Sequence, residues 1–189
     1  MLKLLPNFLT LFRIFMIPAL VIVYLIPGPL GHWLAVLIFY LAAITDYLDG
    51  WLARKLEATS EFGRMLDPIA DKLMVVAVII ILIEFRDING IHTLAAGLII
   101  LREILISWFR EYLTDRGITL AVSHIAKFKT TIQMIALGIL LLGEAGEMIS
   151  PLIHETGLML FWTATLFTIW TAIDYLSEGM RLLKEKIAR

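Results

Sequence analysis

The sequence contains no cysteine and little charge. Without thiols, the chain has no disulfides, no thiolate metal ligands and no cysteine nucleophile. Only 17% of its 189 residues are charged and 60% are hydrophobic, whereas soluble domains average about 25% charged and about 45–50% apolar residues. The shortage of charge therefore excludes an ordinary soluble domain and indicates an integral membrane protein.

The amino-terminal segment also lacks the features of a removable targeting signal. Residues 1–7 show no charged region followed by a short apolar core and a small-residue cleavage site. We therefore expect the first apolar run to be retained as a membrane span.

The hydrophobic runs are long enough for six helices and little else. A transmembrane helix needs about 20 mostly apolar residues, and clusters of Pro, Gly and charged residues separate the runs. The sequence therefore predicts an all-α fold, with a single transmembrane catalytic domain over residues 1–189 built as a bundle of six helices. The predicted spans are residues 8–26, 33–55, 63–83, 93–113, 125–142 and 157–176, with a polar loop over 143–156 and a basic tail over 181–189.

Basic residues lie almost entirely on one side of this predicted topology. With six spans both termini share a side, and nearly all Lys and Arg fall there, leaving Arg86 opposite and Arg102 inside a span. An excess of Lys and Arg near the ends of spans marks the cytoplasmic side. We therefore expect both termini at the cytoplasmic face, in contact with membrane lipids.

Four aspartates interrupt the hydrophobic runs between residues 46 and 71. A carboxylate within a span costs about 2.5–3.5 kcal/mol on insertion scales, so it needs a strong partner. The predicted second and third helices form an antiparallel hairpin that turns near residue 58. Equal depth then pairs Asp46 with Asp71 and Asp49 with Asp67, and the helical period places each helix's aspartates on one face. The sequence predicts a four-carboxylate cluster at the cytoplasmic end of the hairpin.

The chemistry of this cluster favours divalent cations. Carboxylate oxygens without His or Cys suit Mg²⁺ or Mn²⁺ rather than Zn²⁺. Two such ions would neutralise four carboxylates, and a metal pair about 3.5–4 Å apart supports in-line displacement at phosphorus. Two other interpretations stay open. The carboxylates could form salt bridges with Arg54, Arg64 and Lys72, or they could be the ion site of a cation transporter, although transporter sites usually lie near the midplane in broken helices.

The spacing of these residues is specific. From Asp46 to Asp71 the chain reads Asp-x2-Asp-Gly-x2-Ala-Arg-x8-Gly-x3-Asp-x3-Asp, and this pattern resembles the signature of the CDP-alcohol phosphotransferase family at every fixed position. The resemblance implies a six-helix membrane enzyme, usually a homodimer, that transfers a phosphatidyl or similar group from a CDP-linked lipid to an alcohol and releases CMP. We expect no nucleic acid as a partner.

The resemblance also implies roles for individual residues. Two divalent cations, Mg²⁺ or Mn²⁺, would be bound by Asp46, Asp49, Asp67 and Asp71, and Asp71 would also act as the general base on the acceptor hydroxyl. Contacts to the donor, CDP-diacylglycerol, would come from Asn7, Thr10, Gly50, Arg54 and Ser60. From the residues alone, Asn7 and Thr10 could equally be helix caps.

Segments outside the signature resemble one branch of the family, the bacterial enzymes that make phosphatidylglycerophosphate. Residues 5–13 with Pro18, residues 101–103, and residues 127–130 with Gln133 carry this likeness, and Ala126 departs from it because glycine is expected there. The branch implies sn-glycerol 3-phosphate as the acceptor and the bacterial inner membrane as the location. A phosphorylated acceptor needs cations close to the metal site, and the candidates are Arg102, Arg110, Lys127 and Lys129.

Each basic candidate also has a structural interpretation. Three of them could be ordinary anchors at the cytoplasmic face. Arg102 lies in mid-span and needs a partner, which could be Glu103, Asp174 or the acceptor phosphate. Other acceptors also stay open, since a cardiolipin synthase of the same family would use phosphatidylglycerol, and further members use inositol phosphate or serine.

Overall fold

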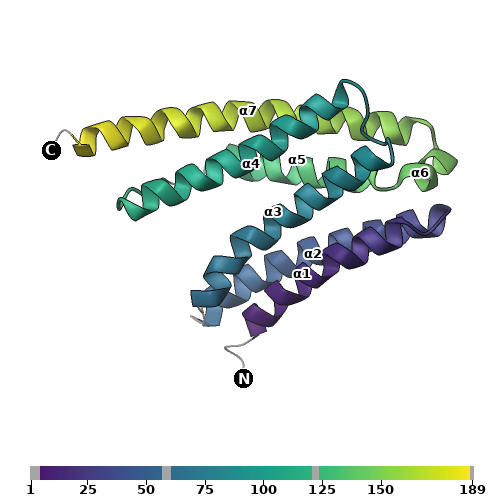
Figure 1. Ribbon diagram of the computed structural model, residues 1–189, viewed down its shortest axis with the longest axis horizontal. Coiled ribbons are helices and arrows are strands. Elements are labelled where there is room, and N and C mark those ends of the chain that lie inside the picture. Colours follow the sequence, from purple (N-terminus) through teal and green to yellow (C-terminus); the bar gives the residue numbers. More distant parts are fainter. Residues whose placement is uncertain (1–4, 57–60, 121–123, 188–189) are drawn as a thin grey trace. The chain divides into compact units, whose positions relative to one another are not determined.

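A computed structural model describes the backbone over residues 5–56, 61–120 and 124–187, and the side chains of residues 11–45, 70, 72–120 and 128–186. Over these residues all regular structure is helical, so the all-α prediction is confirmed. The helices, coloured along the chain in Figure 1, are α1 (Leu5–Tyr24), α2 (Pro29–Leu56), α3 (Glu61–Glu84), α4 (His92–Asp115), α5 (His124–Leu140), α6 (Gly143–Ile149) and α7 (Leu152–Ile187).

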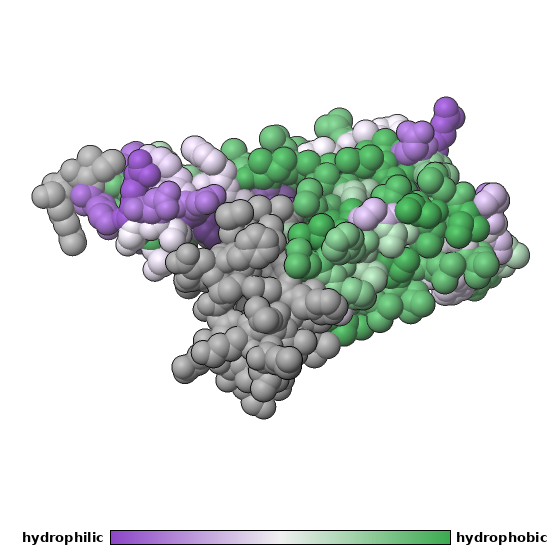
Figure 2. All heavy atoms as spheres, turned by 60° about the horizontal axis from the view of Figure 1, so that its bottom comes forward, coloured by the Kyte–Doolittle hydropathy of each residue, from purple (hydrophilic) through white to green (hydrophobic). Residues whose placement is uncertain are grey.

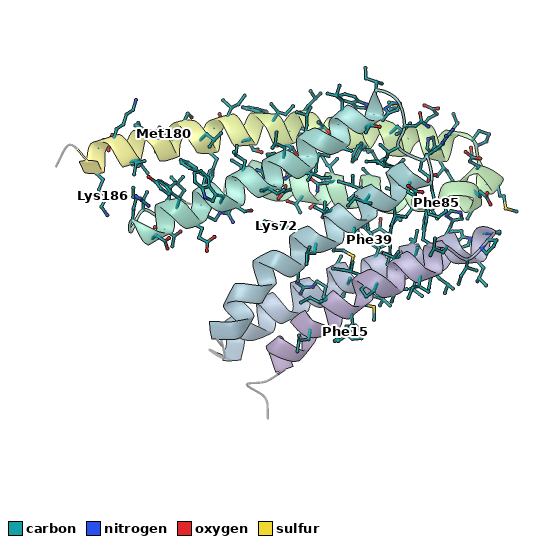
Figure 3. All side chains as sticks on the ribbon, in the orientation of Figure 1. Phe15, Phe39, Lys72, Phe85, Met180 and Lys186 are labelled. Atoms are coloured by element: carbon teal, nitrogen blue, oxygen red, sulfur yellow. The ribbon has the colours of Figure 1, made fainter. Side chains whose placement is uncertain are left out.

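The chain divides into two compact units, the first formed by residues 1–87 and 137–155. In this unit α1 packs against α2 and α3, and α2 packs against α6. Leu20, Phe39 and Leu82 are almost completely buried in its core. Figure 3 labels Phe39 and also Phe15, which is 70% exposed on α1. An exposed phenylalanine on an apolar helix is consistent with contact to lipid.

The second unit contains residues 88–136 and 156–189, and α4 and α7 lie side by side in it (Figure 1). Near their carboxyl ends, Phe109, Leu113 and Ile118 form a hydrophobic cluster against side chains of α7. Gly179 permits this close approach, because a Cβ there would lie 2.5 Å from the Cε1 atom of Phe109. The boundaries between the two units fall within α5 and α7, so each of these helices contributes residues to both units. The single-domain prediction stays a prediction.

The end of α4 shows why the helix stops there. Gly117 follows the C-cap Arg116 and has a φ of 65°, a conformation that glycine adopts without strain. The N–H of Gly117 donates to the Thr114 carbonyl at 2.8 Å, and that of Ile118 donates to the Leu113 carbonyl at 3.0 Å. These two bonds form a Schellman motif, which ends α4 where the sequence predicts a turn.

Polar side chains gather at the carboxyl end of α7. Figure 2 shows hydrophilic atoms over this end of the helix, where Arg181, Lys184 and Lys186 are exposed. Lys186, labelled in Figure 3, donates from its Nζ to the Arg116 carbonyl at the end of α4. A cation at this place is favourable because the last carbonyls of a helix carry partial negative charge.

Length and composition identify two helices that can cross a membrane, His92–Asp115 and Leu152–Lys186. A third is possible if Phe128–Leu140 and Gly143–Ile149, which are bent by 81°, form one broken span. Leu11–Tyr24 and Pro29–Thr45 are shorter apolar helices. These findings cover only the described residues, so the prediction of six spans stays a prediction.

One predicted loop is wrong. The predicted loop over 143–156 contains the helix α6, which begins at Gly143, shortly after α5 ends at Leu140, and includes the helix formers Glu, Ala and Met. The predicted basic tail continues α7 to Ile187, because Leu, Lys, Glu and Arg favour helix and its leucines pack on the cluster of Phe109, Leu113 and Ile118. Glycine therefore suggested a loop in a segment that forms a helix.

Candidate active site

The signature lies on two consecutive helices. Asp46, Asp49, Gly50 and Arg54 fall toward the end of α2, and Asp67 and Asp71 fall in the first half of α3. Only four residues separate the two helices, so the end of α2 and the start of α3 meet at one end of the first unit (Figure 1). The two helices are therefore consecutive and closely connected, as the predicted hairpin requires, while its turn near residue 58 lies outside the described residues.

Helical spacing groups the signature positions along this hairpin. Positions 46, 49 and 53 recur on one face of α2, and positions 63, 67 and 71 recur on one face of α3. The side chains of the four aspartates and of Arg54 lie outside the described side chains, so their pairing by depth stays a prediction. Among the side chains that the structure does describe, no group of three or more His, Asp or Glu residues could hold a metal ion.

The other predicted donor contacts lie on or near the same unit. Asn7 and Thr10 fall inside α1, which begins at Leu5. A capping residue precedes the first helical residue, so this placement does not favour the helix-cap interpretation. The side chains of Asn7 and Thr10 are not among the described ones, and Ser60 lies outside the described residues. The side chain of Lys127, near the start of α5, is not described either.

A buried polar network joins α4, α5 and α7 in the second unit. The Oε1 atom of Glu103 accepts hydrogen bonds from Arg102 Nη1 at 3.0 Å and from Lys129 Nζ at 2.5 Å. Arg102 Nη2 also donates to Thr171 Oγ1 at 3.2 Å. The Lys129 side chain is only 3% exposed. We call Arg102, Glu103, Lys129 and Thr171 the Glu103 network. It brings together Arg102 and Lys129, two of the residues predicted to bind the acceptor's phosphate.

This network shows which group pairs with Arg102, the arginine in the middle of a predicted span. A charge in a membrane helix needs a partner, and Glu103 provides it for Arg102. Asp174, the other acid considered from the sequence, is exposed on α7. The same carboxylate oxygen serves Lys129, which explains how a lysine is accommodated with almost no exposure to water.

Arg110 lies apart from the Glu103 network. It is exposed on α4, eight residues after Arg102, which corresponds to about 12 Å along a helix. Its guanidinium carbon lies 5.6 Å from the centroid of the Tyr175 ring, within the range of a cation–π contact. The structure therefore links Arg110 to α7 and does not bring it together with Lys129.

The sequence analysis missed the threonines of α7. Thr168 and Thr171 are buried on this helix, and Thr171 accepts the hydrogen bond from Arg102. Gln133, which the family resemblance already included, lies one turn after Lys129 and is 2% exposed. Polar residues spaced three or four apart within apolar runs share a helical face, and this spacing is the signal that points to them.

A second polar cluster lies in the first unit, between the carboxyl end of α1 and the turn that follows α3. Tyr24 donates from its hydroxyl to Asp87 Oδ2 at 2.9 Å, and the Tyr24 ring meets His32 edge to face at 4.8 Å. Burial raises the pKa of the Asp87 carboxyl, and the hydrogen bond from Tyr24 works in the opposite direction. This cluster connects the end of α1 to the turn after α3.

The histidines occupy structural positions wherever their contacts are described. His32 packs against Tyr24, and His92 accepts a hydrogen bond on its Nδ1 atom from Trp162 Nε1 at 2.9 Å. These contacts join neighbouring helices within each unit.

The chain belongs to the CDP-alcohol phosphatidyltransferase family, whose model matches residues 3–170. This match includes the whole signature and both helices of the hairpin. Together with the apolar helices, it makes the chain a membrane protein of this enzyme family.

Curated relatives narrow the comparison. A protein of Rickettsia bellii (strain RML369-C) is 45% identical over 171 residues, which cover 90% of this chain and 92% of the relative. A Haemophilus influenzae protein (strain KW20) is 41% identical over 184 residues, 96% of each chain. An Escherichia coli K12 protein is 40% identical over 176 residues, 92% of this chain and 93% of the relative. All three are named CDP-diacylglycerol–glycerol-3-phosphate 3-phosphatidyltransferase.

Proposed function

We propose that the protein transfers the phosphatidyl group of CDP-diacylglycerol to sn-glycerol 3-phosphate, giving phosphatidylglycerophosphate and CMP. The observation that carries this proposal is its near-full-length similarity, at 40–45% identity, to relatives whose names state this donor and this acceptor. The complete signature between Asp46 and Asp71 supports it from the chemical side.

The donor set of the hairpin suits divalent cations. Four carboxylates on two consecutive helices offer the oxygen ligands that Mg²⁺ and Mn²⁺ prefer. We assign Asp46, Asp49, Asp67 and Asp71 to two such ions, which when bound would neutralise the carboxylates and polarise the donor's diphosphate. We assign Asn7, Thr10, Gly50, Arg54 and Ser60 to contacts with CDP-diacylglycerol.

Asp71 then has a second task. Its carboxylate takes the proton of an acceptor hydroxyl as the oxygen attacks the phosphorus next to diacylglycerol, and the bond to the CMP oxygen breaks in line. Base assistance of this kind contributes about 10²- to 10⁴-fold to the rate. We assign the acceptor phosphate to Arg102 and Lys129 of the Glu103 network, with Lys127 and Arg110 as further basic residues for the same group.

The membrane arrangement is part of the proposal. We place six spans in the bacterial inner membrane, with both termini and the hairpin end that carries the signature on the cytoplasmic side, where nearly all Lys and Arg fall. This side supplies the water-soluble acceptor, while CDP-diacylglycerol reaches the site from the lipid. We further propose that the protein works as a homodimer.

Release of CMP from CDP-diacylglycerol by the purified protein in detergent tests the function. We expect release only when both sn-glycerol 3-phosphate and Mg²⁺ or Mn²⁺ are present. Release with phosphatidylglycerol instead of sn-glycerol 3-phosphate would identify a cardiolipin synthase, and release with inositol phosphate or serine would identify another acceptor. If no alcohol supports release, the enzyme function is wrong and a cation transporter becomes the better interpretation.

A further inference from the structure

The charges of the Glu103 network do not cancel. Arg102 and Lys129 are both cations, and among the described side chains Glu103 is the one carboxylate that contacts them. Thr171 is neutral, and its hydroxyl donates to the Phe167 carbonyl at 2.8 Å while accepting from Arg102. Three largely buried charged groups therefore leave one positive charge without a partner among the described side chains. An anion is the group that would complete this network.

Several polar atoms of the network and its surroundings also lack a hydrogen-bond partner in the part of the chain that the structure describes. Lys129 has three N–H donors, of which Glu103 accepts one. The Nε atom of Arg102 is buried and makes no hydrogen bond with the described residues, and the same is true of Oε1 of Gln133. Buried polar atoms normally have partners. Unused donors next to an unbalanced positive charge indicate a place for a small, strongly hydrogen-bonding anion.

The position of Glu103 determines how the two cations are presented. Because Arg102 Nη1 and Lys129 Nζ contact the same oxygen atom, they must lie within the span of a single phosphate group. Without that carboxylate, the two cations would repel each other, and the long side chains of Arg and Lys would have other rotamers available. Glu103 therefore keeps together two charges that would otherwise separate.

We propose that Glu103 is a positioning residue for the acceptor, which holds Arg102 and Lys129 side by side so that both bind the phosphate of sn-glycerol 3-phosphate. Glu103 itself stays on the protein side of the cations and touches no reacting atom. This inference rests on the proposed function, and it assigns to an acidic residue a role in binding an anion.

The first test measures KM for each substrate in Glu103→Gln and Glu103→Asp variants. We expect KM for sn-glycerol 3-phosphate to rise about tenfold or more in both, since a misplacement of about 1 Å can cost about 100-fold. KM for CDP-diacylglycerol should stay within about twofold of the wild type. Glu103→Asp keeps the negative charge and only shortens the reach, so it remains informative if Glu103→Gln fails to fold. Glu111→Gln, an exposed change on the same helix, is the matched control and should alter neither KM.

The second test asks whether Glu103 acts through Lys129. We expect the effect of Glu103→Gln on acceptor KM to become clearly smaller in a Lys129→Met background, because there is then no lysine left to position. If Glu103 served only to neutralise the buried charge of Lys129, removing both groups would restore the wild-type KM for sn-glycerol 3-phosphate in the double variant. Such recovery would overturn the proposal, and so would an unchanged fold-effect of Glu103→Gln in the Lys129→Met background.

Failure of this inference is distinguishable from failure of the proposed function. If the wild type releases CMP with sn-glycerol 3-phosphate but the Glu103→Asp variant keeps the wild-type KM for it, the positioning role is wrong and the function stands. Equal increases in both KM values would also overturn the positioning role. If the wild type releases no CMP with this acceptor, the function itself is wrong, and with it the inference.

Discussion

The hairpin that carries the signature and the Glu103 network have opposite imbalances of charge. Residues 46–72 of the hairpin contain six carboxylates and four basic side chains, whereas the network has two cations for one carboxylate. We have proposed the first region for metal cations and the second for a phosphate, and the sign of the surplus charge is what separates the two proposals. The comparison teaches that this sign, more than the number of charged residues, distinguishes the two regions.

The largest effect should follow from removing the proposed base. We expect Asp71→Asn to lower turnover by about 10²- to 10⁴-fold while the protein still binds CDP-diacylglycerol, as measured by CMP release and by binding of labelled donor. Asp87→Asn makes the same chemical change outside the signature and should leave turnover unchanged. Complete loss of donor binding in Asp71→Asn would contradict its role as principally a base.

The next largest effect should come from the other region. Lys129→Ala removes a charged hydrogen-bond donor, and such bonds are worth about 1.5–3 kcal/mol, so KM for sn-glycerol 3-phosphate should rise about 10- to 100-fold. KM for the donor should change much less. Lys184→Ala, an exposed change on α7, serves as the control. Similar increases in both KM values would make Lys129 a purely structural residue and remove the contrast between the regions.

A change in packing tests the helix pair on which the network is built. Gly179→Ala adds a methyl group 2.5 Å from the Phe109 ring, and overpacking of this kind costs about 1–3 kcal/mol. We expect a lower Tm in detergent. Gly97→Ala, also in a helix but with nothing within 4 Å of the added Cβ, should be neutral or stabilising because alanine favours helix. Equal Tm values for the two variants would show that α4 and α7 are not this close at Gly179.

The smallest effect concerns Asp87, a carboxylate that belongs to neither region. Burial raises its pKa in the folded protein, so the folded state holds the proton more firmly than the unfolded state does. The resulting stabilisation is complete below the ordinary carboxyl pKa and is lost as pH rises through the raised value. Asp87→Asn should therefore gain slightly in Tm relative to the wild type as pH rises above the ordinary carboxyl pKa of about 4. A pH-independent difference between the two proteins would argue against the raised pKa.

The placement of the signature on two consecutive helices could be predicted from the sequence, because the signature residues recur at fixed local spacing. The helical period and the short connection place Asp46 and Asp71 on one hairpin without any knowledge of long-range packing. The helical content was predictable for the same reason, since apolar runs of sufficient length favour helices. The pairing of the four carboxylates across the hairpin stays a prediction.

The Glu103 network was only partly predictable. The sequence shows that Arg102 needs a partner and that its neighbour Glu103 is one candidate. It does not show that Lys129, 26 residues later, shares the same carboxylate oxygen, because that contact depends on how α5 packs against α4. The role of Thr171, 69 residues after Arg102, depends likewise on the packing of α7. The helix α6 was missed because its glycines suggest a loop when packing is unknown.

The 36-residue helix α7 is longer than a bilayer's apolar layer. At 1.5 Å per residue it extends about 54 Å, against a hydrocarbon thickness of about 30 Å. Even at a tilt of about 40°, the upper end of the usual range, it would extend about 41 Å along the membrane normal. Several of its turns must therefore leave the lipid, and the exposed charges from Arg181 to Lys186 mark the end that does so. The last turns of α7 therefore cross from lipid into water. A fluorophore attached at successive residues along these turns would report the position at which its surroundings change from apolar to aqueous.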